Sequence, residues 1–70
     1  MGFRNERLKA GKTVKEVMEA LNVSDAAVYL WETGETRPKL DNLIKLAELY
    51  GCTIDDLIFD DKEGSVSESL

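Results

Sequence analysis

Two helix signatures in this chain are separated by only two residues, and this spacing constrains the fold more than any other feature. Thr13 followed three residues later by Glu16 is a capping box, a pattern that starts a helix. Asn22 tolerates the left-handed backbone that ends a helix, and Ser24 suits the N-cap of the next one. Helices joined by so tight a turn cannot lie antiparallel in contact along their length. They must cross steeply, which is the helix-turn-helix arrangement.

Other segments with helical signals flank this pair, and none shows a useful β-alternation or an internal repeat. Phe3 and Leu8 give the first helix a thin apolar side, and the fourth helix has a poor cap because Lys39 occupies its N-cap site. The sequence therefore predicts an all-α fold of five helices. Their expected ranges are 3–10, 13–21, 24–33, 40–50 and 53–59, with glycines after the first, third and fourth.

The chain has 70 residues, which is enough for one small domain. We expect that domain to cover residues 1–59, and residues 60–70 to form an acidic, disordered tail. The net charge is −5, but it is unevenly distributed. Residues 1–39 hold seven basic and six acidic side chains, whereas residues 40–70 hold two basic and eight acidic ones. The first half can therefore present a local basic face despite the overall charge.

Several functional classes have no support in the composition. The chain has no histidine and one cysteine, so zinc and haem patterns are absent and a nucleophile would lack its usual base. The acidic residues near the end lack the glycine and the ligand spacing of a calcium-binding loop. We therefore expect them to be exposed to solvent. We expect no enzyme activity, no catalytic residue, no metal and no cofactor. No apolar run approaches the ~20 residues that span a bilayer, so we expect a cytoplasmic protein without a membrane partner.

The expected helix over residues 24–33 has two different sides. On a helical wheel, Ala27, Val28 and Trp31 fall together and have the volume to pack onto neighbouring helices. The opposite side, here called the outer face, is a narrow ridge with few large groups. A helix presented this way fits the DNA major groove, which is ~12 Å wide. The outer face consists of Asp25, Ala26, Tyr29, Leu30 and Thr33.

The ordered set of residues over 3–58 resembles the XRE family, the helix-turn-helix domains of phage Cro and repressor proteins. No single motif is specific, but the set at this spacing is. The resemblance implies the five-helix fold of lambda-repressor-like domains. The matching residues are Thr13, Glu16, Val17, Leu21, Val23, Ser24, Val28, Trp31, Glu32, Gly34, Pro38, Leu43, Leu46, Ala47, Gly51 and Thr53 to Leu57.

The resemblance also implies roles for individual residues. Glu32 would form an ion pair with Arg7, the position that supplies an arginine in this family. Base edges would be contacted by Asp25, Ala26, Tyr29 and Leu30. DNA phosphates would be held by the start of the second helix, an anion site by construction, and by nearby side chains. These side chains are Thr13, Thr33, Arg37, Lys39, Lys12 and Arg4.

Several positions depart from the family pattern. Val14 stands where a DNA-gripping glutamine is common, and Glu35 stands where a basic residue is common. Met18 replaces a small alanine, which can shift the angle at which the helices cross. The outer face lacks Arg, Lys, Gln and Asn, the residues that pair bidentately with bases. Specificity would then rest on apolar contacts to thymine methyls, on the Tyr29 hydroxyl and on Asp25.

The function that the resemblance implies is sequence-specific transcriptional regulation through double-stranded DNA, with repression as the expected direction. A homodimer would bind two half-sites, with Leu57 and Phe59 of the last helix as the expected dimer contact. A repressor from a prophage, or an antitoxin, fits a protein of this size, and an antirepressor or a toxin would be its protein partner. The alternative is a protein-interaction module that uses the same fold with little DNA readout.

For some side chains the sequence is consistent with two roles, and for others it favours one. Tyr29 is either a groove contact or an exposed or interfacial tyrosine, and Leu30 could equally contact a protein. Trp31 is predicted to lie in the core rather than to stack against a ligand, and Tyr50 is also predicted to lie in the core. Cys52 reads as a buried, inert thiol.

Overall fold

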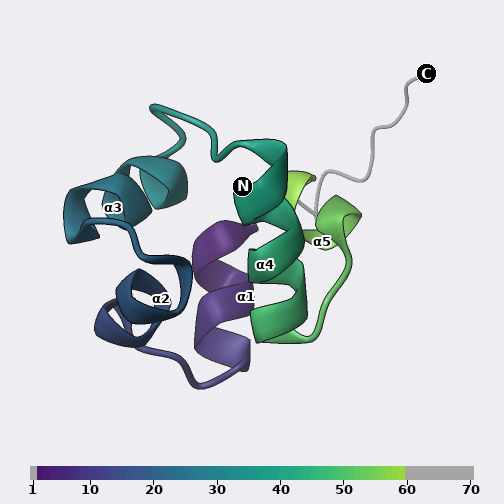
Figure 1. Ribbon diagram of the computed structural model, residues 1–70. Helices are drawn as coiled ribbons and strands as arrows, with labels where there is room; N and C mark the ends of the chain where they lie inside the picture. Colours follow the sequence, from purple (N-terminus) through teal and green to yellow (C-terminus); the bar gives the residue numbers. More distant parts are fainter. Residues whose placement is uncertain (1, 60–70) are drawn as a thin grey trace.

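The computed structural model describes residues 2–59, which fold into five helices with no strand among them (Figure 1). The expected all-α, five-helix fold is confirmed. The predicted tail over residues 60–70 lies outside the described residues. The helices are α1 (Phe3–Lys9), α2 (Val14–Leu21), α3 (Asp25–Thr33), α4 (Leu40–Tyr50) and α5 (Ile54–Ile58).

Local side-chain chemistry fixes both the start of α2 and the turn between α2 and α3. The Glu16 backbone N–H donates to the Thr13 hydroxyl oxygen at 3.1 Å, and the Thr13 N–H donates to the Glu16 carboxylate at 2.8 Å. Asn22 adopts the left-handed conformation at φ 58°, and the Ser24 hydroxyl accepts the N–H of Ala27 at 3.2 Å to begin α3. The two predicted helix ends around Asn22 are therefore present as expected.

Other helix ends follow the same local rules. Gly34, at φ 87°, ends α3 in a conformation that costs glycine little. A second capping box, in which the Thr53 hydroxyl accepts the Asp56 N–H at 3.1 Å, begins α5. Lys39 makes no side-chain cap to α4, as predicted. Phe59 differs from the expectation, because it lies just past α5 with an extended backbone.

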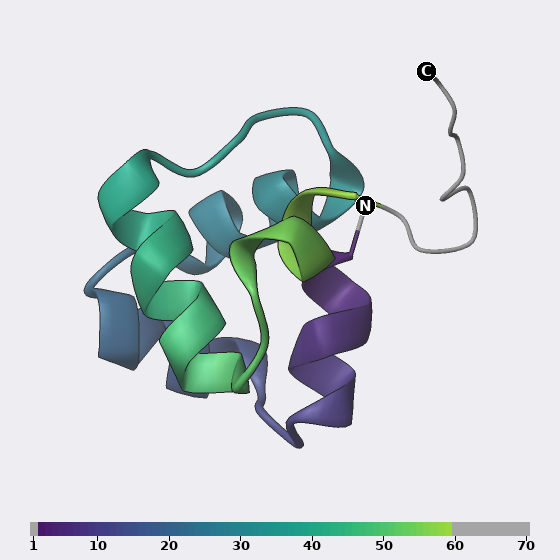
Figure 2. The ribbon, with the colours of Figure 1, turned by 90° about the vertical axis from the view of Figure 1, so that its right-hand side faces the viewer.

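Each helix contributes to one core. The side chains with the least exposure are Val17 of α2, Val28 of α3, Leu46 of α4 and Leu57 of α5. Phe3 of α1 is buried in the same core, and α1 packs against α5 (Figure 2). Trp31 and Tyr50 are also buried, as predicted.

The apolar side of α1 differs from the prediction. Leu8 is 54% exposed, and the side of α1 that packs inward carries Phe3 and Arg7 instead. A close backbone contact holds this end of α1 to α5, because the Gly2 N–H donates to the carbonyl of Leu57 at 3.2 Å. None of the helices in residues 2–59 has the length and apolar character to cross a membrane.

Candidate nucleic-acid interface

The orientation of α3 separates a buried side from an outer face. Val28 and Trp31 are buried and Ala27 packs against the core, as the helical wheel predicts. The outer face remains uncovered, apart from Leu30, which is half-buried. Asp25, Ala26, Tyr29 and Thr33 are all exposed. A side of α3 is therefore free to meet a partner, while its other side anchors it to α2 and α1.

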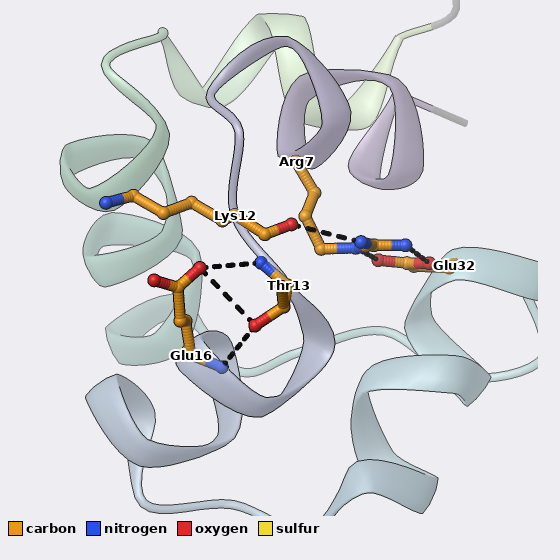
Figure 3. Close-up of polar contacts among 5 residues, drawn as sticks. All are labelled: Arg7, Lys12, Thr13, Glu16 and Glu32. Carbon is orange, nitrogen blue, oxygen red and sulfur yellow. Dashed lines mark hydrogen bonds and ion pairs between the residues drawn. The ribbon is translucent and has the colours of Figure 1, made fainter.

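A buried ion pair holds the end of α3 against α1 (Figure 3). Arg7 Nε donates to Glu32 Oε2 at 2.6 Å, and Arg7 Nη2 donates to Glu32 Oε1 at 3.1 Å. The side chains are only 10% and 7% exposed. The structure thus brings together the two residues that the family resemblance paired. The hydrogen bond to Glu32 raises the pKa of Arg7 above its ordinary value, so the guanidinium remains charged.

The same arginine makes a third bond that the sequence did not indicate. Arg7 Nη1 donates to the backbone carbonyl of Lys12 at 3.1 Å, in the segment that leads to the N-cap of α2 (Figure 3). One side chain therefore connects α1, the end of α3 and the start of α2. This bond could not be read from residue spacing, because its acceptor is a backbone atom that any residue type would supply.

The capping box of α2 already uses some of the hydrogen-bond donors at the start of the helix. Thr13 uses its N–H and its hydroxyl within the capping box, and the N–H bond from Thr13 lowers the pKa of the Glu16 carboxyl. The N–H groups of Val14 and Lys15, in the first turn, have no partner within the helix. These two donors, rather than the capped ones, remain available to an anion.

The other predicted phosphate contacts are spread around these elements. Arg4 on α1 and Thr33 at the end of α3 are exposed, and the Thr33 hydroxyl donates to the Leu30 carbonyl at 3.1 Å. Lys12 is half-buried. Arg37 and Lys39 are exposed in the loop between α3 and α4, on either side of the buried Pro38.

A hollow of about 390 Å³ lies where α1, α2 and α3 meet. It collects two predicted phosphate contacts, Arg4 and Thr33, with one predicted base contact, Tyr29. Val14, at the position where the family commonly has a DNA-gripping glutamine, also lines it. The full lining is Arg4, Arg7, Val14, Tyr29, Glu32 and Thr33.

The Cys52 thiol and the Tyr50 phenol both have raised pKa values. Cys52 is half-buried, not buried as expected, and this partial burial raises the pKa of its thiol, which favours the protonated form. Burial likewise raises the pKa of Tyr50 to about 12. Within residues 2–59, no group of three or more metal-binding side chains comes together.

Comparisons with known proteins agree with this geometry. A family model described as helix-turn-helix matches residues 3–57. The HTH-type transcriptional regulator ImmR of Bacillus subtilis (strain 168) is 33% identical over 67 residues, which are 96% of this chain. The chain spans about half of that regulator, 53% of its length. No solved structure matches the chain.

Proposed function

Because the chain belongs to the XRE family of helix-turn-helix domains, we propose that it is a sequence-specific DNA-binding transcriptional regulator, acting as a repressor. In this proposal α3 enters the major groove by its outer face. The observation that carries it is the presentation of α3, whose buried side is locked to the core while its outer face stays open. The low bulk of that face suits the groove width of ~12 Å.

The proposed base contacts follow from the chemistry of the outer face. Asp25 would accept a hydrogen bond from the N4 amino group of cytosine, and Ala26 and Leu30 would contact thymine methyls. Tyr29 is the fourth proposed base contact, and it would reach the base through its hydroxyl. Because no side chain on the face can form a bidentate pair with a base, we expect modest discrimination between sequences.

The proposed phosphate contacts supply most of the affinity. The first-turn N–H groups of α2 offer a neutral anion site, supported by the positive end of the helix dipole. Exposed cations and hydroxyls around α3 would add charge and hydrogen bonds. The proposed set is Thr13, Thr33, Arg37, Lys39, Lys12 and Arg4.

We also propose that the protein binds as a homodimer to two half-sites about one helical turn apart. One part of the expected dimer contact is wrong, because Leu57 is 0% exposed and belongs to the core. Phe59 remains accessible at 63% exposure. A dimer contact at this end of the molecule would have to rest on Phe59 without Leu57.

The proposal is tested by selecting duplexes from a random pool and titrating the best one with salt. The logarithm of the affinity should fall linearly with the logarithm of salt concentration, by about 0.9 for each phosphate contacted. Arg37→Ala should weaken the selected and a scrambled duplex equally, whereas Leu30→Ala should reduce the preference between them. Failure to bind any duplex at low salt would refute the proposal.

A second candidate function is a protein-interaction module, such as an antitoxin that binds a toxin. It is favoured by one observation, the absence of Arg, Lys, Gln and Asn from the outer face of α3. Binding of a protein through this apolar face would vary little with salt, unlike binding of DNA. A protein partner that protects Leu30 and Tyr29 from solvent, combined with no duplex selection, would support this second function.

A further inference from the structure

Tyr29 lies on a different flank of α3 from Leu30, another of the proposed base contacts. At about 100° per residue, Ala26 and Thr33 lie at the crest of the outer face, with Leu30 on one flank and Tyr29 on the other. Tyr29 shares its flank with Asp25, one turn earlier, and with Glu32, which is turned toward α1 by the ion pair with Arg7. The tyrosine is therefore directed toward the junction with α1 and α2.

The lining of the hollow agrees with this placement. Tyr29 borders it together with Arg4 of α1 and Val14 of α2, whereas Asp25, Ala26 and Leu30 do not. The position of Tyr29 on the helix and the lining of the hollow thus both place it beside α1 and α2.

The unsatisfied groups at this hollow suit an anion. Arg7 is committed to Glu32 and to the Lys12 carbonyl. Arg4 is exposed and makes no ion pair with any other residue in 2–59. Tyr29 is 53% exposed, and its hydroxyl has no hydrogen-bond partner within residues 2–59. One free cation and one free hydroxyl donor remain, beside the apolar side chain of Val14.

We propose that this hollow seats one backbone phosphate of DNA, which the Arg4 guanidinium and the Tyr29 hydroxyl hold together while Val14 packs against the adjoining deoxyribose. The inference rests on the proposed function, and it changes the role of Tyr29 from a base contact to a sequence-independent one. A phosphate suits the site because it accepts hydrogen bonds from both groups at once, and charge-assisted bonds are the strong ones. Valine in place of a polar residue suits a sugar contact.

The test uses four proteins, the unmodified chain, Tyr29→Phe, Arg4→Ala and the double variant, against the selected duplex and a scrambled one. Tyr29→Phe should weaken both duplexes by the same factor, roughly threefold to tenfold, because only a hydroxyl is removed. It should leave the salt dependence unchanged, since a neutral group releases no counterion. Arg4→Ala should weaken both and lower the salt slope by about 0.9.

The double variant decides whether the two groups hold the same phosphate. If they do, Tyr29→Phe should have little further effect once Arg4 is removed, so the two effects are not additive. Leu30→Ala is the matched control, because it should change the preference between the duplexes. Both Tyr29 and Arg4 are exposed, so thermal unfolding of the variants should match that of the unmodified chain.

Three results would overturn the inference while leaving the proposed function intact. These are a Tyr29→Phe effect confined to the selected duplex, no effect of Tyr29→Phe on either duplex, or full additivity with Arg4→Ala. If the unmodified chain binds no duplex at all, the proposed function itself fails, and the phosphate seat fails with it.

Discussion

Replacing Arg7 by alanine should destabilise the fold by about 3–5 kcal/mol, the usual cost of leaving one partner of a buried ion pair unpaired. The structure supports the cost of a buried pair rather than that of a surface pair, because the Arg7 and Glu32 side chains are 10% and 7% exposed and share two hydrogen bonds. The third bond, to the Lys12 carbonyl, would be lost as well. A domain of this size has only about 4–10 kcal/mol of total stability, so the variant should approach its unfolding threshold.

The assay is urea unfolding followed by the fluorescence of Trp31, the only tryptophan and a buried one. Glu32→Ala should cost a similar amount, whereas the double variant Arg7→Met/Glu32→Leu should cost less than either single change, because no charge is then left unpaired. Lys9→Ala provides a matched control on the same helix. Its partner Glu6 lies 3.5 Å away and Lys9 is 67% exposed, so its loss should cost at most ~1 kcal/mol.

The reasoning would be refuted if Arg7→Ala cost no more than Lys9→Ala. It would also be refuted if the double variant lost the sum of the two single effects, since that would mean the charges do not depend on each other. Arg7→Lys gives an intermediate check. It retains the charge but not the planar fork, so some of the three bonds should be lost.

Three further predictions concern other contacts. Gly2→Ala should destabilise the fold by about 1–3 kcal/mol in the same urea assay, because its Cβ would clash with the Asp56 carbonyl oxygen; an unchanged midpoint would mean that α5 shifts freely. Asn22→Gly should be close to neutral and Asn22→Val destabilising, since φ is 58° there; equal thermal midpoints would contradict this. Stability should fall as pH drops below about 4.5, because hydrogen bonds from the N-caps hold the pKa values of Glu16 and Asp56 below those of the unfolded chain, which therefore binds more protons. Glu16→Gln should flatten that dependence in urea titrations at several pH values, and an unchanged slope would exclude Glu16 as a contributor.

The sequence by itself determined the helices and the turn between α2 and α3. The Thr13 capping box, the left-handed Asn22 and the Ser24 cap act over three or four residues, so their effects can be read from neighbours in the chain. The buried side of α3 could be predicted for the same reason, because the spacing of Val28 and Trp31 follows the helical period. The Arg7–Glu32 pair was expected from family resemblance and not from local pattern.

Only the tertiary structure decided which apolar side chains reach the core and what surrounds Tyr29. Leu8 and Phe59 are exposed while Leu57 is fully buried, and nothing in their spacing distinguishes them. Their burial depends on how α5 docks on α1, more than forty residues away along the chain. The hollow beside Tyr29 likewise needs three helices to meet. Such contacts arise from packing between distant segments, whereas local propensity acts within one or two turns of a helix.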